Sequence, residues 1–401
     1  MIDTGNTAFV LLSAALVAIM TPGLAFFYGG LVKRKNVLTI MMQSFISMGI
    51  VTVLWALFTF SMAFGPDVHG FIGDMSFGLL HGVGIEPSTV YGTSVPFLAF
   101  FVFQMMFAII TPALITGAFT ERMNFKSYLV FLVLWSVLVY APLAHWVWGG
   151  GFIAQLGAID FAGGTVVHIS AGMGALASVF ALGKRQDKAH SPHNITHVAL
   201  GVALLWFGWY GFNAGSALAA NGQAALAFAN TDIAASMAMV TWLLLSWLVD
   251  GRPSMVGALT GAVAGLVAIT PAAGYVDPMA SLVIGIAASF CCYYAVKFRI
   301  KMKWDDALDV WGCHGVGGIV GSILTGVFAV KAAGGFSGLL EGNPALFIAN
   351  LEGTAIAMVY SFVMTYIIIM VLKMFMKISV EPKEEQEGLD RALHGEEAYD
   401  F

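Results

Sequence analysis

Charged residues are scarce in this chain: Asp, Glu, Lys and Arg make up 10% of its 401 residues, whereas soluble proteins average about 25%. Hydrophobic residues account for 59%. Too few polar side chains remain to cover a soluble domain of this size, so the composition excludes an ordinary soluble enzyme and a nucleic-acid-binding protein. It indicates a protein that crosses a membrane several times.

Cysteine is also rare, and no basic leader precedes the first apolar run. The three cysteines (Cys291, Cys292 and Cys313) lie within apolar stretches and two are adjacent, so no disulfide framework is implied. The N-terminal stretch MIDTGNTAFVLL contains no Lys or Arg. It therefore indicates the start of a first membrane span and not a cleaved signal peptide.

Long apolar stretches fill most of the chain. A bilayer core requires about 20 apolar residues per helix, and eleven stretches qualify. They lie at roughly 5–31, 37–64, 94–119, 127–148, 162–183, 195–219, 225–249, 254–271, 278–299, 307–330 and 346–376. We expect an all-α integral membrane protein with eleven transmembrane helices. Residues 1–376 would form one transmembrane domain and residues 377–401 a polar tail.

Basic residues are nearly absent from one set of connections. Every one of the 18 Lys and Arg residues except Lys331 lies beside an odd-to-even connection or in the tail. Basic connections stay in the cytoplasm, so the pattern predicts an N-terminus outside and a C-terminus inside. The tail, SVEPKEEQEGLDRALHGEEAYDF, is the one sustained polar segment, and its composition alone favours disorder.

Two histidines lie inside spans, each eight residues after an aspartate. His168 follows Asp160 in DFAGGTVVHISAG, and His314 follows Asp306 in DALDVWGCHGVGG. Ionisable side chains at this depth usually mark a pathway or a binding site. These spans are the fifth and the tenth, so the chain divides into two sets of five (about 1–185 and about 194–330) and a final helix (about 346–376). Because five is odd, the second set is inverted, which predicts a site between the repeats near the membrane midplane.

Each histidine is followed four residues later by a glycine, Gly172 or Gly318, which allows close helix packing on the same face. Three alternatives remain open for the pair. The histidines could be unrelated, each bonded to a backbone carbonyl. They could ligate a haem between two spans, or hold a metal ion, although no third ligand is evident.

Aromatic side chains share helix faces in the third and sixth spans. Phe103 and Phe107 are four residues apart on one face. Trp209, Phe212 and Ser216 fall at positions i, i+3 and i+7 of another. Rings that face lipid would explain such patterns, but this explanation is weaker near spans that carry small polar residues.

Trp148 ends the fourth span at the outer surface, where an interfacial aromatic belt is the simplest explanation. Aromatic faces also attract cations, by up to about 2 kcal/mol when desolvated. We find no carboxylate deep in a span, so a bare cation would lose its hydration at a cost of many kcal/mol. A cation that releases a proton avoids this cost by crossing as a neutral molecule, as ammonium does and potassium cannot.

Five stretches and the tail resemble the ammonium transporter (Amt/Rh) family over essentially the whole chain. They are TPGLAFFYGGLV, FQMMFAIITPALITGAFTER, DFAGGTVVHISAG, GWYGFNAGSAL, DDALDVWGCHGVGGIVGSILTGVFA and, in the tail, GLDRALHGEEAY. Trp148 and the two histidines favour the Amt branch, of the prokaryotic type. Tyr210 and Trp311 stand where related bacterial proteins often carry Phe, at positions with no assigned role.

The resemblance implies an outer site that binds ammonium. Trp148, Phe107 and Ser216 would form it, with Phe103 at its flank. Asp160 would shape the site from a structural position. Methylammonium would serve as an analogue of the substrate.

The resemblance also implies a pore beneath this site, built from a five-plus-five inverted repeat. Phe107 and Phe212 would form a stacked gate. His168 and His314 would be the pair of pore histidines, and Trp209 would line the lumen.

Assembly and regulation follow from the same resemblance. It implies a homotrimer in the plasma membrane whose cytoplasmic tail is ordered and docks a PII-type regulatory protein. No enzymatic activity, cofactor or bound metal is expected. Two functions stay open: a transporter or channel that conducts ammonia, with or without a relayed proton, and a sensor that binds ammonium and signals through its tail while transporting little.

Overall fold

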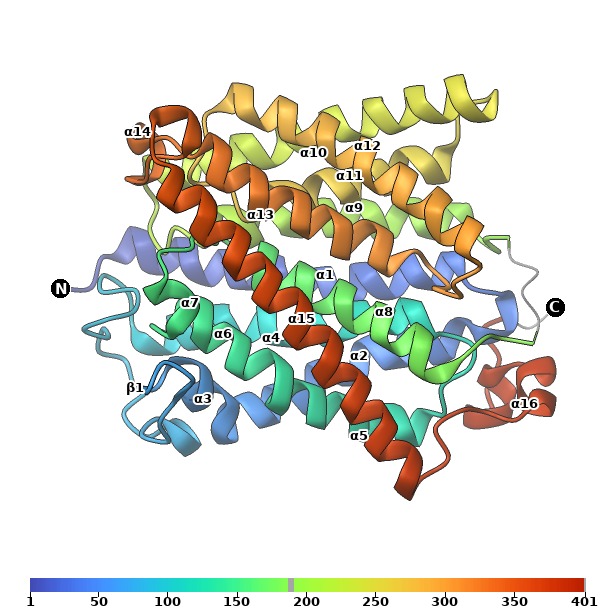
Figure 1. The fold of residues 1–401 in the computed structure, drawn as a ribbon. Coiled ribbons are helices and arrows are strands. Elements are labelled where there is room, and N and C mark those ends of the chain that lie inside the picture. Colours follow the sequence, from blue (N-terminus) through green and yellow to red (C-terminus); the bar gives the residue numbers. More distant parts are fainter. Residues whose placement is uncertain (187–190, 400–401) are drawn as a thin grey trace.

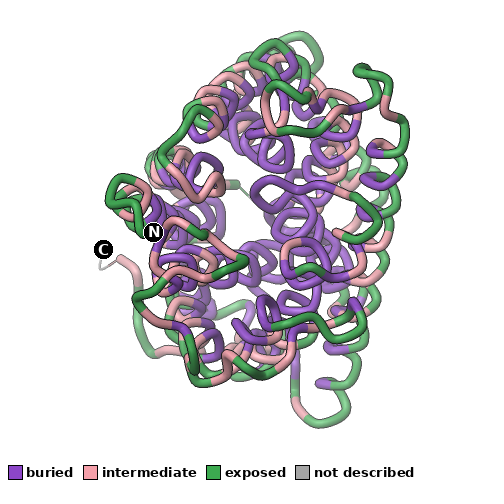
Figure 2. Tube along the Cα trace, turned by 90° about the vertical axis from the view of Figure 1, so that its left-hand side faces the viewer, coloured by how far each residue is buried: buried purple, intermediate pink, exposed green. Residues whose placement is uncertain are grey.

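The structure, a computed structural model, describes residues 1–186 and 191–399. Long helices run between two faces: the N-terminus lies at one, which we call the N-terminal face, and the C-terminal tail at the opposite one, the tail face (Figure 1). Ten helices in the described ranges are long and apolar enough to span a membrane. Buried residues fill the middle of the bundle and exposed ones lie on its rim (Figure 2). The chain is a multi-pass membrane protein.

The first five spans occupy residues 4–182. Their helices are α1 (Thr4–Leu31), α2 (Val37–Leu54) continued by η2 (Trp55–Thr59) and α3 (Phe60–Phe64), α4 (Phe97–Phe119), α5 (Phe125–Trp135) continued by η4 (Ser136–Tyr140) and α6 (Ala141–Trp148), and η5 (Gly164–Ile169) with α8 (Ser170–Leu182). The connections contain η1 (Arg34–Asn36), η3 (Gly78–Leu80), α7 (Phe152–Gln155) and two short antiparallel strands, β1 (Asp67–Val68) and β2 (Ile72–Gly73).

The remaining spans follow from residue 195. They are α9 (Ile195–Gly215), α10 (Gly222–Asp250), α11 (Met255–Ile269), α12 (Pro278–Met302), η6 (Trp311–Gly315) with α13 (Val316–Phe328), and α15 (Pro344–Phe375). Short helices α14 (Lys331–Gly334) and η7 (Leu339–Glu341) precede α15, and α16 (Pro382–Glu387) and η8 (Asp390–His394) form the tail. In Figure 1, α15 runs obliquely across the bundle.

The eighth expected span is present but shorter than the sequence suggested. Residues 254–271 were expected to form it, whereas α11 covers Met255–Ile269, 15 residues, or roughly 22 Å. Proline lacks a backbone N–H and cannot donate the next helical hydrogen bond, so Pro271 ends this helix early.

The two segments that carry His168 and His314 cross through reciprocal glycine contacts. A Cβ at Gly172 of α8 would lie 2.1 Å from the backbone nitrogen of Gly315 in η6. A Cβ at Gly318 of α13 would lie 2.9 Å from the backbone oxygen of Gly164 in η5. Each histidine-bearing segment therefore packs backbone to backbone against the other, as expected from the glycine four residues after each histidine.

The tail is folded against the bundle, so disorder, which its composition favoured, is wrong for the described residues. The carboxylate of Asp390 accepts hydrogen bonds from the backbone nitrogens of Leu38 and Thr39 at 2.9 and 2.8 Å, at the start of α2. The backbone nitrogen of Leu389 donates to the side chain of Asn36 at 2.8 Å. Asp390 is buried, and the order predicted from the family resemblance is present.

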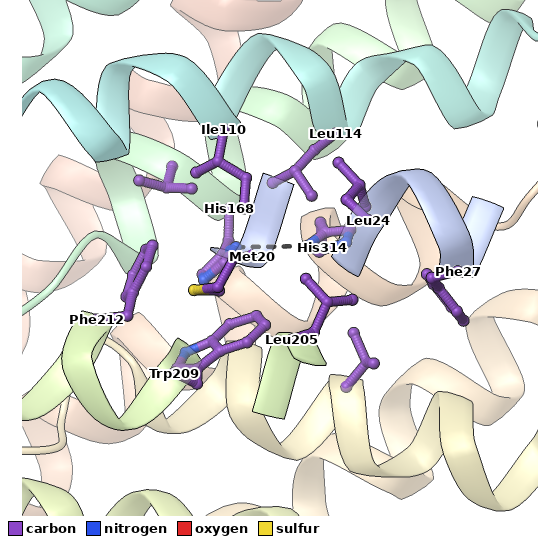
Figure 3. A pocket seen from close by; sticks show the side chains of 12 residues that line it. Met20, Leu24, Phe27, Ile110, Leu114, His168, Leu205, Trp209, Phe212 and His314 are labelled. Atoms are coloured by element: carbon purple, nitrogen blue, oxygen red, sulfur yellow. Dashed lines mark hydrogen bonds between the residues drawn. The ribbon is translucent and has the colours of Figure 1, made fainter. Parts of the chain in front are cut away.

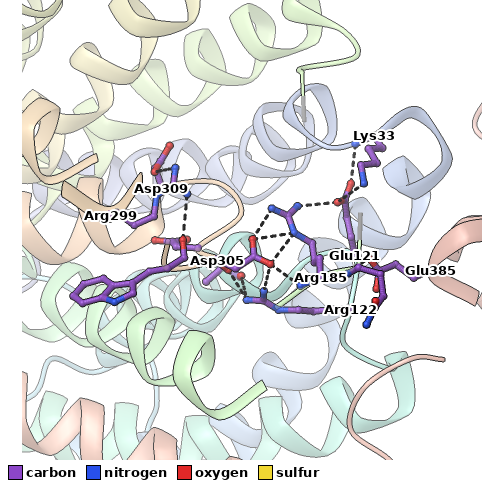
Figure 4. A network of polar contacts seen from close by, with 12 residues as sticks. Lys33, Glu121, Arg122, Arg185, Arg299, Asp305, Asp309 and Glu385 are labelled. Atoms are coloured by element: carbon purple, nitrogen blue, oxygen red, sulfur yellow. Dashed lines mark hydrogen bonds and ion pairs between the residues drawn. The ribbon is translucent and has the colours of Figure 1, made fainter. Parts of the chain in front are cut away.

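A buried ionic network joins both repeats at the tail face (Figure 4). Arg185 contacts Glu121 and Asp305 at 2.8 Å each, and Arg122 contacts Asp305 at 2.9 Å. Lys33, after α1, lies 3.7 Å from Glu121. These residues follow α1, α4, α8 and α12, so the network ties four connections of the fold together.

The network sets the protonation of its carboxylates. Burial alone would raise the pKa of Asp305, but hydrogen bonds and charge from Arg185, together with the charge of Arg122, hold that pKa below its ordinary value. Burial likewise opposes the ionisation of Glu121, but the charge of Arg185, together with hydrogen bonds from Lys33 and Asn36 and the charge of Lys33, outweighs it and lowers the pKa. A carboxylate whose pKa is lower in the folded than in the unfolded protein stabilises the fold when it is ionised. This stabilisation is fully present above the unfolded-state pKa of about 4, and it is lost as the pH falls through the lower folded-state pKa.

Asp305→Asn is therefore expected to lower the free energy of unfolding by about 3 kcal/mol at pH 7, because it leaves buried Arg122 and Arg185 without their shared carboxylate. The deficit should begin to shrink as the pH falls below about 4, and it should disappear below the lower pKa at which the native carboxylate is itself protonated. Thermal unfolding in detergent at both pH values measures this. Lys297→Met, which removes an exposed pair with Asp250, is the control and should change stability by less than about 1 kcal/mol. An equal loss of stability in Asp305→Asn and Lys297→Met would contradict the conclusion that the buried network stabilises the fold more than an exposed ion pair does.

Candidate functional site

The first histidine stands on a π-helical turn that begins at a capping aspartate. The carboxylate of Asp160 accepts hydrogen bonds from the backbone nitrogens of Gly163, Gly164 and Thr165 at 2.7, 2.8 and 2.7 Å. The backbone nitrogen of Val166 adds a longer bond at 3.3 Å. Because both carboxylate oxygens are occupied by the backbone, Asp160 orients the start of η5 and is not free to bind a cation.

The second histidine repeats this arrangement. The carboxylate of Asp306 accepts hydrogen bonds from the backbone nitrogens of Val310 at 3.1 Å and Trp311 at 2.7 Å, at the start of η6. His314 lies on that turn, as His168 lies on η5. The repeated spacing of eight residues therefore reflects one local structure: an aspartate caps a turn, and the turn carries a histidine to the bundle axis.

The two histidines are in direct contact. Their Nδ1 atoms lie 3.3 Å apart, and the rings are nearly parallel, with centroids 5.4 Å apart. Both side chains are buried, and Nε2 of His168 has no hydrogen-bond partner among the described residues. Two unprotonated Nδ1 atoms would repel each other, and so would two protonated ones. One Nδ1 therefore donates a hydrogen bond and the other accepts it.

This contact decides between the alternatives for the pair. Rings that touch through their nitrogens leave no space for a flat macrocycle, so haem ligation between them is wrong. Within residues 1–186 and 191–399, no group of three or more His, Cys, Asp and Glu side chains is arranged to hold a metal ion. The histidines are also not unrelated, since they bond to each other.

Apolar side chains surround the histidines and form a narrow lumen (Figure 3). Leu24, Leu114 and Leu205 lie around His314, and Trp209 lies beside His168 with ring centroids 5.4 Å apart. The lining consists of Met20, Leu24, Phe27, Ile110, Leu114, Val167, His168, Leu205, Trp209, Phe212, Val263 and His314. The indole nitrogen of Trp209 donates to Thr270 at 2.9 Å, so among these side chains the histidines supply the polar groups.

Two phenylalanines close the lumen toward the N-terminal face. The rings of Phe107 and Phe212 have centroids 4.2 Å apart and are tilted by 40°. Both are buried, and Phe212 in turn lies over His168 at 6.0 Å between centroids. In this structure the two rings separate the lumen from the cavity beyond them.

That cavity opens at the N-terminal face and has a volume of about 370 Å³; we call it the vestibule. Trp148, Phe107 and Ser216 line it together. The rings of Trp148 and Phe107 meet edge to face at 5.9 Å. The indole nitrogen of Trp148 donates a hydrogen bond to the backbone oxygen of Asp160 at 3.0 Å. The hydroxyl of Ser216 donates one to the backbone oxygen of Phe212 at 2.9 Å.

Phe103 occupies a different position from the one expected. It is fully buried and packs edge to face against Phe107 at 5.0 Å, and it does not line the vestibule. A shared helix face predicted that the two rings are neighbours, but not which ring faces the cavity. Phe103 therefore supports Phe107 from behind.

The expectation that no carboxylate lies deep in a span is also wrong. Asp232 lies within α10, ten residues after Gly222. The hydroxyl of Tyr210 donates to it at 2.6 Å, and both residues are partly exposed on the side of the bundle. Asp232 does not line the lumen or the vestibule, so it offers no deep carboxylate to a cation in the pore.

A second cavity, of about 200 Å³, reaches the lumen from the tail side. It is lined by His314, Phe27, Tyr28 and the paired side chains Asp309 and Arg299, whose closest atoms are 2.7 Å apart. The sequence analysis assigned no role to Phe27, Tyr28 or Arg299. The histidine pair thus lies between two cavities that open toward opposite faces.

The sequence analysis also missed Gln104, whose side chain lines the vestibule. A signal was available: Gln104 precedes Phe107 by three residues and therefore shares its helix face. A polar side chain on a face that also carries Phe100 and Phe107 is the kind of exception that marks a site.

Comparisons with known proteins agree with this geometry. A family model described as Ammonium Transporter Family matches residues 8–399. An ammonium transporter of Bacillus subtilis (strain 168) is 49% identical over 400 residues, which is 98% of each chain. The crystal structure of Candida albicans Mep2 superposes with a TM-score of 0.90 at 35% identity, covering 96% of this chain and 88% of that one.

A solved structure described as a sensor Amt protein is similar to the same degree. It superposes with a TM-score of 0.90 at 29% identity and covers 97% of this chain and 98% of that one. The family model spans nearly the whole chain, and the relatives match it from end to end. The chain therefore belongs to the ammonium transporter family.

Proposed function

We propose that this protein transports ammonium across the plasma membrane, taking it up at the vestibule and passing ammonia through the lumen. The observation that carries the proposal is the pair of histidines in direct contact, enclosed by apolar side chains between two cavities. An apolar lumen rejects ions that keep their charge, because stripping their hydration costs many kcal/mol. Ammonium escapes this cost because it can release a proton and cross as neutral ammonia, with the proton relayed separately.

The vestibule would select the cation before this step. The rings of Trp148 and Phe107 present π faces, and the lone pairs of the Ser216 hydroxyl accept hydrogen bonds. With Phe107 and Phe212 in contact beneath it, the bound cation would wait above a closed gate. Brief separation of the two rings would admit ammonia to the lumen.

In the lumen, the histidine pair would guide ammonia and relay its proton. The unpartnered Nε2 of His168 is available to hydrogen-bond an ammonia molecule or to receive a proton. The contact between the two Nδ1 atoms provides the next step of a relay toward His314 and the tail-side cavity. This work needs no cofactor and no covalent chemistry, in keeping with a transporter and not an enzyme.

Orientation and assembly complete the proposal. The basic residues at the tail face support an orientation with that face in the cytoplasm and the vestibule outside. The partly exposed carboxylate of Asp232 on a membrane-spanning helix would be costly against lipid, which favours a neighbouring copy on that side of α10. We propose a homotrimer, and a PII-type regulatory protein as the partner of the docked tail at the cytoplasmic face.

A second function, ammonium sensing with little transport, is favoured by the likeness to the sensor Amt protein. The docked tail would transmit the signal. Uptake of labelled methylammonium into proteoliposomes separates the two functions: a transporter takes it up faster than protein-free vesicles, and ammonium competes. Uptake at the rate of protein-free vesicles, by correctly folded protein, would contradict transport.

Trp148→Leu tests the vestibule. The change removes the indole face, so we expect about tenfold weaker ammonium competition against methylammonium uptake, with normal folding. Trp247→Leu is the matched control, since Trp247 is exposed on α10 and should leave competition unchanged. If Trp148→Leu competes like the wild type, the indole does not bind the cation.

A further inference from the structure

Gln104 places an unsatisfied hydrogen-bond acceptor in the wall of the vestibule. Phe100, Gln104 and Phe107 fall at i, i+4 and i+7 on α4 and line the cavity as one stripe. The amide oxygen Oε1 is buried and has no hydrogen-bond partner among the described residues. Buried polar atoms are rarely left unpaired, because they lose their water without replacement. The position therefore calls for a ligand.

The other polar groups of the vestibule are largely occupied. Both carboxylate oxygens of Asp160 accept backbone hydrogen bonds, and its backbone oxygen accepts from Trp148. The hydroxyl hydrogen of Ser216 is directed to the backbone, which leaves its lone pairs free to accept. Gln223 has its amide nitrogen bonded to a backbone oxygen at 3.2 Å.

An ammonium ion brings four N–H donors to this cavity. Aromatic faces attract its charge but offer no lone pair for a directed bond. The amide of Gln104 can turn by half a rotation about its last side-chain bond, which exchanges its oxygen and nitrogen ends. Because Oε1 accepts no hydrogen bond from a described residue, the rotation breaks no hydrogen bond at Oε1. The rotation can therefore direct this oxygen toward a cation.

We propose that Gln104 is a direct ligand of the substrate cation, accepting one N–H of ammonium while Ser216 accepts another. The inference rests on the proposed function and adds a determinant of selectivity to it. Methylammonium has three N–H donors and one methyl group, so it can leave one acceptor unfilled. Ammonium therefore depends on Gln104 more strongly than methylammonium does.

Gln104→Leu tests this, because leucine is similar in size and removes the acceptor. In proteoliposomes, we expect the inhibition constant of ammonium against methylammonium uptake to rise about tenfold. The KM of methylammonium should rise less, and the maximal rate per folded protein should stay near the wild-type value. A purely structural role gives the opposite pattern, since removing an unpaired buried acceptor leaves affinity unchanged and melting temperature equal or higher.

Two further variants make the result decisive. Gln104→Met keeps the side-chain length and replaces Gln104→Leu if the latter folds poorly. Gln155→Leu, at an exposed glutamine on α7 that does not line the vestibule, should change the ammonium inhibition constant by less than about twofold. If the wild type transports and Trp148→Leu weakens ammonium competition, but the Gln104 variants keep the wild-type inhibition constant, the ligand role is overturned and the proposed function stands. If the folded wild type takes up no methylammonium, the proposed function fails, and this inference fails with it.

Discussion

His168→Ala/His314→Ala is expected to abolish the ammonium-dependent current without preventing folding. The two rings are the polar groups among the side chains that line the lumen, so their removal leaves nothing there to accept or pass on a proton. Neutral ammonia could still diffuse through the wider apolar space. Current on a solid-supported membrane, normalised to folded protein, measures the change.

Single changes that retain a titratable group provide the control. His168→Glu and His314→Glu should keep part of the current, or alter ion selectivity, because a proton can still be held in the lumen. If the histidines only fill space, the double alanine variant should melt at a lower temperature yet carry normal current. Full current with native selectivity at normal protein yield would refute the relay.

Gly172→Ala is expected to disrupt the fold where the two repeats cross. The added Cβ would lie 2.1 Å from the backbone nitrogen of Gly315, and backbone cannot move aside as a flexible side chain does. We expect a loss of about 3 kcal/mol in the free energy of unfolding, and a loss of transport in the folded fraction, because η6 carries His314. Melting temperature and proteoliposome uptake measure the two effects.

Gly49→Ala is the matched control in another membrane helix. A Cβ at Gly49 would meet no heavy atom within 4 Å, and alanine favours helix over glycine by about 1 kcal/mol. This variant should be as stable and as active as the wild type, or slightly more stable. If Gly172→Ala and Gly49→Ala have the same melting temperature and uptake rate, the segments that carry His168 and His314 can move apart at Gly172 without loss of stability or transport.

Hydropathy predicted the helical architecture well because a bilayer imposes one length and one composition on every span. It extended the eighth span too far because an apolar count does not weigh Pro271. The tail shows the complementary failure. Its composition is polar throughout, yet Asp390 finds backbone partners at the start of α2, and only the motif resemblance predicted that order.

The histidine pair was predictable because the same Asp-to-His spacing occurs in the fifth and the tenth predicted spans. The vestibule was predictable only in part. Helix periodicity places Phe103 and Phe107 on one face, but packing against another helix decides which ring is covered. Gln104 was not predicted because it lies within a hydrophobic run that is rich in aromatic residues. The sequence does not show that its amide oxygen lacks a hydrogen-bond partner; only the structure does.

The occupied carboxylate of Asp160 has a kinetic consequence. A free carboxylate 4 Å from a cation would deepen its energy well by about 4 kcal/mol at an effective dielectric constant of 20, which would lengthen its dwell time roughly a thousandfold. Here backbone amides already hold both oxygens of that carboxylate and stabilise its charge. Under the proposed function, a cation in the vestibule would therefore rest in a shallower well and exchange faster with the medium, so this geometry would favour rapid turnover over tight retention.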